Sequence, residues 1–314
     1  MSFSTILDQD VPVRLVRRIV AAGRVPNGML FWGPGGVGKQ LAALETAKAI
    51  NCLETPGDAC DHCLACRKIA HGNHPDLKIV APAGATRIIK VEAIEEIIDV
   101  AMYRPYEAKW RVVIIHDADR INNASQNHFL KTLEEPPSAT VFILITENPR
   151  MLLPTIRSRC QQFRFGALNP ETVVKLLQRD RDLPRDTAHA VAMLSQGQMS
   201  RALDLITTER REIVLDIVRR LNDREDPLLL GAEFHKFLQG RSEEIRRAIA
   251  ADYAARRDDP AFEDAKTKDD LEEEIDATTA GRLRLEYMEY LYLLKTWYRD
   301  VYVYRVTGGF DHVL

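Results

Sequence analysis

A glycine-rich stretch at residues 33–40 has the residue types that hold the phosphates of a nucleotide. Its sequence, GPGGVGKQ, matches the phosphate-loop pattern GxxxxGK[ST] at every position except the last. In such loops backbone N–H groups surround the phosphates, the lysine neutralises them, and the final hydroxyl binds Mg²⁺. Gln40 has no hydroxyl, so one metal ligand is missing. The candidate phosphate-binding residues are Gly33, Gly35, Gly36, Gly38 and Lys39.

A second metal ligand is also missing. In P-loop NTPases a later strand ends in an acidic residue that holds Mg²⁺, often followed by a base that orients water. The run RVVII at residues 111–115 predicts this strand, which puts His116 at the metal position and Asp117 at the base position. A shift of one residue would make Asp117 the ligand but would turn every strand side chain to the opposite face. We favour the unshifted alignment and expect no Mg²⁺ site, with ATP or ADP binding left open.

Four of the five cysteines lie close together, in the spacing C-x7-C-x2-C-x2-C. In a chain without a secretion signal this spacing indicates a metal site rather than disulfides. Four thiolates suit a structural Zn²⁺ and leave no open position for catalysis. Four buried free thiols are the alternative, and the nearby His62 and His71 are alternative ligands. The candidate zinc ligands are Cys52, Cys60, Cys63 and Cys66.

Length and composition describe an ordinary globular protein. A chain of 314 residues accommodates about two or three domains. The net charge of -3 marks no general affinity for nucleic acid, so any DNA contact must come from a local patch or a larger assembly. No run approaches the ~18 apolar residues of a membrane span, and the N-terminus lacks the basic start and apolar segment of a secretion signal. We expect a cytoplasmic protein.

The elements that must position these residues alternate between strand and helix. A strand, the glycine loop and a helix follow one another at residues 28–50, the order that a phosphate loop requires. The alternation continues to residue 165 and predicts an α/β fold with a mainly parallel sheet covered on both faces. The remaining predicted elements are strands at 76–80, 111–115, 140–146 and 161–165, the last at a sheet edge, and helices at 12–22, 88–102, from 125 and 152–159.

Two further motifs, LKTLEEPP at residues 130–137 and LPTIRSRC at 153–160, make a resemblance specific. Together with the glycine loop and the cysteine module, they resemble the AAA+ clamp-loader subunits of bacterial DNA polymerase III. The resemblance is strong over residues 3–165, fair to about 205 and weak beyond. Catalytic subunits of this family carry a complete phosphate loop and an acidic pair after the strand. The chain departs from that pattern at Gln40 and His116, as in a subunit that has lost its own ATP hydrolysis.

The resemblance implies roles for several polar residues. Arg159 would be an arginine finger that points into the ATP site of a neighbouring subunit, unless it belongs to a solvated basic face. Thr146 and Asn148 would sense the γ-phosphate at a strand end, or else only cap that strand. Arg201 would be the second sensor, or else a surface arginine near a helix start.

The resemblance also implies an architecture and partners. An AAA+ nucleotide-binding-type domain would span residues 1–166 with a zinc module at 52–66, followed by a helical lid at 167–207 and an all-α collar at 208–314. The chain would join gamma/tau and delta subunits in a five-membered ring that loads the sliding clamp onto primed DNA. The rival reading is an active gamma/tau-type ATPase, which needs Gln40 to be tolerated and Asp117 to hold Mg²⁺. A zinc enzyme is disfavoured by the four thiolates.

The C-terminal part reads as helices with two unusual stretches. Residues 170–206 give three short helical patterns, and from residue 211 three more follow, with separate patterns at 226–239 and 242–257. Residues 255–276 are mostly charged, which indicates a solvated helix end or a mobile loop. Tyr and Trp crowd residues 281–309. They could stack bases, but interleaved Leu and Met favour a buried helix–helix interface.

Overall fold

The computed structural model describes residues 2–82, 88–89, 91–257 and 268–308. By contacts the chain divides into two compact units. Of the described residues, 2–82, 88–89 and 91–202 belong to the first unit, and 203–257 and 268–308 belong to the second. The finer division into three domains at residues 166 and 207 stays a prediction.

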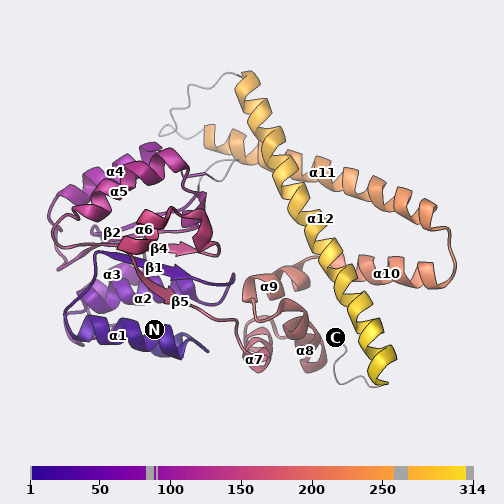
Figure 1. Cartoon of the computed structure of the whole chain (residues 1–314), viewed down its shortest axis with the longest axis horizontal. Coiled ribbons are helices and arrows are strands. Elements are labelled where there is room, and N and C mark those ends of the chain that lie inside the picture. The colour runs from indigo at the N-terminus through magenta and orange to yellow at the C-terminus, as the bar shows by residue number, and fades with distance from the viewer. Residues whose placement is uncertain (1, 83–87, 90, 258–267, 309–314) are drawn as a thin grey trace. The chain divides into compact units, whose positions relative to one another are not determined.

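A five-stranded parallel sheet forms the centre of the first unit (Figure 1). Its order is β2-β3-β4-β1-β5, so the strand that precedes the glycine loop lies between β4 and β5. This confirms the predicted α/β fold and the edge position of the last strand. The strands are β1 Gly28–Trp32, β2 Leu77–Val80, β3 Arg111–Ile115, β4 Thr140–Thr146 and β5 Gln161–Arg164.

Helices cover both faces of this sheet, as Figure 1 shows. Every residue of β3 and β4 is buried, which is the pattern of strands covered on two sides. On α4, Ile94, Ile97 and Ala101 are buried at helical spacing and pack in the same core as Phe129 and Phe142. One face carries α4 Val91–Met102 and α5 Asn123–Glu134, and the other carries α1 Asp10–Ala21, α2 Lys39–Asn51 and α3 Leu64–Ala70.

Three helices, α7 to α9, follow the last strand of the sheet, and four shorter ones lie before or between the strands. The three helical patterns expected in residues 170–206 are present, which confirms that prediction, and the last of them continues from the first unit into the second. Gly197 stands between two of them at φ +72°, where a Cβ would lie 2.3 Å from the carbonyl oxygen of Leu168. The short helices are η1 Phe3–Thr5, η2 Ala118–Arg120, η3 Pro149–Met151, α6 Pro154–Arg159, α7 Pro170–Arg181, α8 Arg185–Ser195 and α9 Met199–Thr207.

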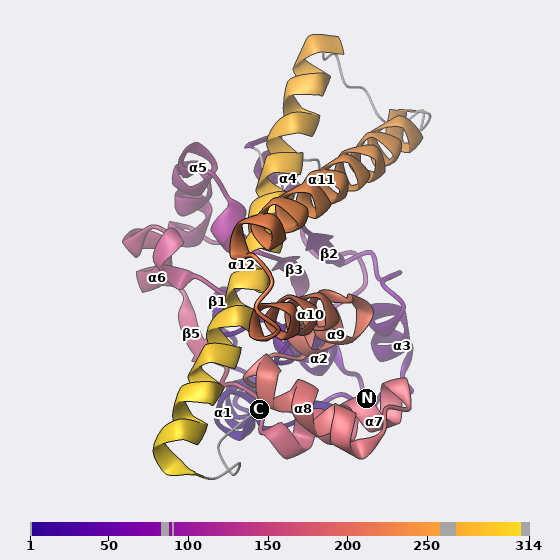
Figure 2. The same ribbon diagram turned by 90° about the vertical axis from the view of Figure 1, so that its right-hand side faces the viewer.

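In the described part of the second unit, three helices follow the end of α9: α10 Arg210–Asn222, α11 Pro227–Arg257 and α12 Lys268–Thr307. Helix α12 packs along both others (Figure 2). The helical patterns expected at 226–239 and 242–257 form one continuous helix, α11, which runs through Gly240. An isolated glycine costs a helix only about 1 kcal/mol, and this one is tolerated. Of the charged stretch 255–276, residues 258–267 lie outside the described residues.

Ion pairs and aromatic rings hold α12 in place. Arg210 and Arg241 both donate to the buried carboxylate of Glu286, with nitrogen–oxygen distances of 3.0 and 3.2 Å. Tyr290, one turn further, meets Phe234 edge-on at a centroid distance of 5.2 Å. The predicted helix–helix interface is therefore present on this face of α12. No helix in the described part of the chain is long and apolar enough to cross a membrane.

Candidate functional site

The glycine loop connects β1 to α2, with Lys39 as the first residue of that helix. Two of its glycines are required by their surroundings. Gly33 has φ +148°, and a Cβ there would lie 2.3 Å from the carbonyl oxygen of Phe165. Gly36 has φ +70°, a left-handed conformation that side chains disfavour. The local structure is therefore that of a strand, a tight glycine turn and a helix start, which is the arrangement of a phosphate loop.

Lys39 is turned onto its own loop. Its side chain is buried, and Nζ donates a hydrogen bond to the carbonyl oxygen of Gly33 at 2.7 Å and another to that of Pro34. Burial lowers the pKa of Lys39, while the nearby charges of Glu147, Asp117 and Asp119 oppose that shift. The positive charge of the ammonium group is thus balanced by carbonyl oxygens and carboxylates of the same chain.

Two side chains that the sequence did not single out lie over the loop. A Cβ built on Gly35 would be 2.5 Å from Oε1 of Glu147 and 2.8 Å from Oγ of Ser200. A Cβ on Gly36 would be 2.1 Å from the backbone nitrogen of Ser200. The start of α9 and the residue after β4 therefore pack directly on the backbone that surrounds phosphates in an active loop.

Beside the loop lies a cavity of about 490 Å³. As predicted, β3 ends at Ile115, and His116 follows the strand directly. Burial lowers the pKa of His116, opposed by the charge of Asp117, which favours the neutral imidazole. Mg²⁺ prefers oxygen ligands, and His116 offers only nitrogen. The lining residues are Gly36, Gly38, Lys39, Gln40, Leu41, Leu44, His116, Asp117, Ile145, Thr146 and Glu147.

The two residues expected as a γ-phosphate sensor are engaged within the chain. The hydroxyl of Thr146 donates to Oδ1 of Asp119 at 2.5 Å and accepts the N–H of Asn148 at 2.9 Å. The sequence did not predict that Asp119 contacts Thr146. Asp119 stands four residues after β3, and the carboxyl ends of β3 and β4 are neighbours in the sheet. Thr146 lines the cavity, whereas neither Arg159 nor Arg201 is among its lining residues in the described chain.

Arg159 is the last residue of α6 and is partly exposed. Its Nη2 donates to Oε1 of Glu134 at 2.5 Å, and its Nη1 donates to the carbonyl oxygen of Thr155 at 3.2 Å. Both partners are exposed, so the guanidinium lies at the protein surface with its charge balanced across α5 and α6. Arg201 is half-buried on α9, next to the Ser200 that covers the loop.

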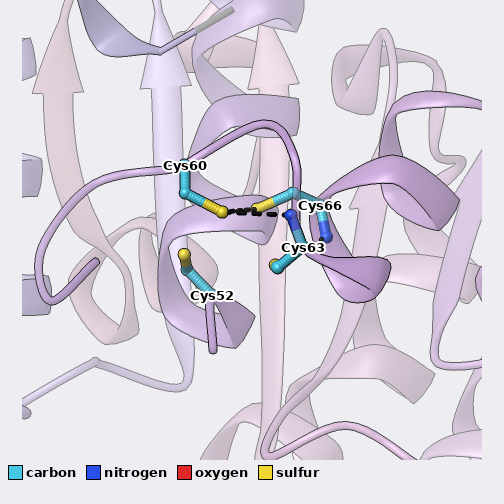
Figure 3. Close-up of side chains that lie close together, drawn as sticks. All are labelled: Cys52, Cys60, Cys63 and Cys66. Atoms are coloured by element: carbon cyan, nitrogen blue, oxygen red, sulfur yellow. Dashed lines mark hydrogen bonds between the residues drawn. The ribbon is translucent and has the colours of Figure 1, made fainter. Parts of the chain in front are cut away.

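The four predicted zinc ligands converge. Their Sγ atoms all lie within 4.8 Å of one another, and Cys60 and Cys66 face each other at 4.0 Å (Figure 3). Backbone N–H groups point at the sulfurs: Cys63 N lies 3.2 Å from Cys60 Sγ, Cys66 N lies 3.4 Å from Cys63 Sγ, and Thr55 N lies 3.3 Å from Cys52 Sγ. Such donors favour the thiolate form that binds metal.

The acidities of these thiols also fit a cation site. At Cys52 burial opposes ionisation, yet N–H donors from Glu54, Thr55 and Cys60 lower its pKa to about 7. Burial raises the pKa of Cys66, and the neighbouring Cys63 and Cys52 raise it further, because a second thiolate beside the first is unfavourable without a positive ion. Four soft sulfur donors at this spacing can hold one metal ion such as zinc.

A buried ion-pair triad joins this module to α2. Nζ of Lys48 lies 2.7 Å from a carboxylate oxygen of Glu45 and 2.6 Å from one of Asp61, which stands between the cysteines. The Lys48 side chain is 2% exposed. Burial lowers and the two carboxylates raise the pKa of Lys48, and the net direction is upward. The cysteine module is therefore fixed to the helix that starts at the phosphate loop.

The loop, the parallel sheet and the helices on both its faces define a P-loop protein with the AAA+ type of fold. Residues 8–169 match the family model described as DNA polymerase III, delta subunit. The chain belongs to this family.

Similar proteins carry names from the same complex. The chain is 34% identical over 200 residues to DNA polymerase III subunit delta' of Bacillus subtilis (strain 168), which covers 64% of this chain and 59% of that protein. It is 35% identical over 179 residues to subunit gamma/tau of Mycobacterium tuberculosis (strain ATCC 25618 / H37Rv), covering 57% of this chain and 31% of that one. The chain thus matches less than two thirds of each relative.

Among solved structures, a gamma subunit-related protein of Thermotoga maritima aligns with a TM-score of 0.43 at 22% identity. The alignment covers 67% of this chain and 62% of that chain.

Proposed function

We propose that the chain is the delta-prime subunit of a replicative clamp loader, which supports ATP-driven loading of the sliding clamp onto primed DNA without hydrolysing ATP itself. It would act in a five-membered ring with gamma/tau and delta subunits. Its domains would be the AAA+ module at 1–166, the lid at 167–207 and the collar at 208–314. The observation that carries the proposal is a phosphate loop within this family that lacks both metal ligands, at Gln40 and His116.

The contacts around the loop support the loss of ATP hydrolysis. A nucleotide would have to separate Lys39 from the carbonyl oxygens of Gly33 and Pro34 and move Glu147 and Ser200 from the loop. It would then meet no hydroxyl at position 40 to hold Mg²⁺. Nucleotide bound without hydrolysis would use the glycine backbone and Lys39, with Thr146 and Arg201 as neighbours in a degenerate site.

Arg159 would donate its guanidinium to the ATP site of a neighbouring subunit. In the single chain its charged partner, Glu134, is 48% exposed, and exposed ion pairs contribute only about 0.2–1 kcal/mol. Exchange of Glu134 for a phosphate is therefore inexpensive. A guanidinium supplied in trans stabilises the charge on the transferred phosphoryl group and is worth roughly 10³ to 10⁵ in rate in other NTPases.

The four cysteines would bind a structural Zn²⁺. The ion would neutralise thiolates that otherwise repel one another and would order residues 52–66, which contain few apolar side chains. With four sulfur ligands it has no open position, so its contribution is to folding and not to catalysis.

One experiment tests whether the chain lacks ATP hydrolysis of its own and donates an arginine finger to a neighbouring subunit. The purified full chain alone should show no Mg²⁺-dependent ATP hydrolysis. Assembled with gamma/tau and delta subunits, the Arg159→Ala variant should lower the ATPase rate of the complex at least tenfold, while Arg150→Ala, which removes a nearby exposed arginine, should leave it unchanged. Gel filtration checks that the Arg159→Ala variant still forms the complex, so that a lower ATPase rate is not caused by failed assembly. An unchanged rate would remove the finger role.

The second candidate function is an ATPase in its own right, because Asp117 lines the cavity beside Lys39. On that reading Asp117 would hold Mg²⁺ and Lys39 would leave the loop carbonyls. ATP turnover by the isolated chain that disappears in Lys39→Ala would establish this candidate and reject the first.

A further inference from the structure

A groove of about 400 Å³ lies in the second unit, between α10 and the first part of α11. The two helices diverge from the connection at residues 223–226, and both contact α12 (Figure 1). The cavity beside the phosphate loop is a different one, since its lining residues belong to the first unit. The groove is therefore a second hollow in the molecule that the nucleotide-binding motifs do not explain.

The floor of the groove is apolar and already formed in the single chain. Phe234 and Phe237 lie nearly parallel, with ring centroids 6.2 Å apart, and both rings meet Tyr290 of α12 edge-on. Phe237 is nevertheless 37% exposed, so an apolar surface remains uncovered. Because α12 holds these rings, a ligand would not have to order them. The apolar lining residues are Ile213, Ile217, Leu230, Phe234 and Phe237.

One wall of the groove is acidic. Glu209, Glu212 and Asp216 stand three and four residues apart, so they follow one side of α10. Within the described chain neither Glu209 nor Asp216 forms an ion pair. Glu212 reaches only the adjacent Arg211, at 3.6 Å and with both side chains exposed. This wall therefore carries carboxylates that lack firm basic partners.

A basic residue at the end of the groove does not balance this wall. Arg220 is held by Glu225 and Glu233, with nitrogen–oxygen distances of 2.7 and 2.8 Å. Its guanidinium therefore has its own two carboxylates, on the side away from the first turn of α10. The lining residues together keep an excess of negative charge.

Helix stability explains only part of the acidic wall. Glu209 is the N-cap of α10 and Glu212 lies in its first turn, where the positive end of the helix dipole stabilises carboxylates. Asp216 lies near the middle of the helix, where that effect has faded and aspartate is a poor helix former. The position of Asp216 beside the groove is therefore not accounted for by the helix itself.

We propose that this groove binds an amphipathic helix of another polypeptide, with its apolar face on the floor and Lys or Arg on the flank that faces α10. Helices bound in grooves present apolar residues at i, i+3 or i+4, and i+7. From Glu209 to Asp216 the wall extends over about 10 Å of helix, so basic residues one turn apart would meet the carboxylates. The same wall repels the phosphates of nucleic acid and of anionic lipid.

The floor and the wall have different tasks in this interaction. Burial of apolar side chains against Phe237 and its neighbours supplies most of the affinity. The exposed carboxylates set the orientation of the bound helix and select basic partners over acidic ones. The inference rests on the second unit alone and does not depend on the assignment to a clamp loader.

Designed peptides test the proposal on the full chain. Two fluorescein-labelled peptides of about 20 residues, long enough to form a helix, share the same leucine face. One carries lysines on its flanks, and the other carries glutamates at the same positions. Fluorescence anisotropy should show binding of the lysine peptide and at least about tenfold weaker binding of the glutamate peptide.

Charge reversal makes the test specific to this wall. The double variant Glu212→Lys, Asp216→Lys should bind the lysine peptide about tenfold more weakly than the wild type does, and the glutamate peptide more tightly. The matched control is Glu272→Lys, Glu273→Lys, which makes the same change in net charge at exposed positions of α12. The control should keep the preference for the lysine peptide.

A second pair of variants tests the floor. Phe237→Ala should weaken binding of the lysine peptide about tenfold. Leu229→Ala, at a 65% exposed leucine of α11 outside the groove lining, should not. Circular dichroism checks that each variant keeps its helices. The proposal is overturned if neither peptide binds, if both bind equally, or if the double charge reversal leaves the preference unchanged. These outcomes do not affect the ATPase test of the proposed function.

Discussion

Gly36 lies where the phosphate loop meets the start of α9. Its φ is +70°, and a Cβ there would be 2.1 Å from the backbone nitrogen of Ser200. Gly72, elsewhere in the same unit, has nearly the same φ, +72°, but no atom within 4 Å of its Cβ position. Alanine substitutions at these two glycines therefore measure two free-energy costs separately: that of the left-handed backbone alone, and that of the backbone plus the lost contact between loop and helix.

We expect Gly36→Ala to destabilise the first unit by about 2 kcal/mol or more, because the left-handed conformation costs about 1 kcal/mol and the clash displaces α9. Gly72→Ala should cost only the backbone part. Urea unfolding measures both, and hydrogen exchange at residues 199–207 should be faster in Gly36→Ala alone. Equal losses in the two variants would show that α9 does not depend on this contact.

At the scale of residues, motif positions identify Gln40 and His116 as departures from the phosphate-loop pattern, but they do not identify the residues that lie over the loop. The structure ends β3 at Ile115, where the apolar run RVVII predicts its end. Glu147 and Ser200 could not be found that way, because their places depend on the conformation after β4 and on how α9 folds back, which no local pattern encodes. The convergence of the cysteines was predictable, since the spacing itself brings sulfur atoms together.

At the scale of elements, the loop between α4 and β3 is held by one buried carboxylate. Asp76 accepts backbone N–H groups from Tyr106, Glu107 and Ala108 at 2.7 to 2.9 Å and pairs with Arg111 at 3.1 Å. Burial works against ionisation of Asp76, but these donors together lower its pKa below the usual 3.8. The loop therefore depends on the ionised form of a side chain that is fully buried.

We expect Asp76→Asn to reduce the free energy of unfolding by about 3 kcal/mol at pH 7, because it leaves Arg111 buried without its carboxylate. Since the folded pKa is depressed, the contribution is complete well above 3.8 and is lost as the pH falls through the folded value. The difference between variant and wild type should thus shrink in acid. Urea unfolding at several pH values measures it, with the exposed Asp99→Asn as control.

The helices show where periodicity succeeds and where it does not. Helix α4 could be predicted because its apolar residues recur every three or four positions against the sheet. The helical patterns at 226–239 and 242–257 join in one helix, because α11 packs along α12 and these tertiary contacts outweigh the low helix propensity of Gly240. Sequence signals of helix ends are weak whenever a neighbouring helix supplies the stability.

At the scale of the whole molecule, α12 carries a long apolar face that is exposed in the single chain. Its members stand three, four or seven residues apart, which puts them on one side of the helix. Exposed apolar faces of this length are common at protein–protein contacts, so this face is the candidate contact surface for another chain. The residues are Leu285, Met288, Leu291, Tyr298, Tyr302 and Val306, each more than half exposed.

If this face joins the ring proposed above, a charge within it should prevent assembly. We expect Leu291→Glu to lower the affinity of the chain for gamma/tau and delta subunits at least tenfold, because an unpaired carboxylate would be buried in the contact. Analytical ultracentrifugation of the mixed subunits measures this. Leu228→Glu, at an 82% exposed leucine on α11, is the matched control. If the Leu291→Glu variant assembles normally, this face of α12 does not form the contact with the partner subunits.

Helix α2 gives the molecule an electrical polarity. It starts at Lys39, beneath the phosphate loop, and ends next to Cys52, so its aligned peptide dipoles put partial positive charge at the loop and partial negative charge at the cysteines. At the positive pole, an ammonium group adds to the dipole, and the chain compensates both with the carboxylates of Glu147, Asp117 and Asp119. At the negative pole lie the four cysteines, whose thiolates would take a cation from the surrounding solution if they bind the proposed Zn²⁺. One helix would then separate a positive end, balanced by carboxylates of this chain, from a negative end that a bound metal ion neutralises.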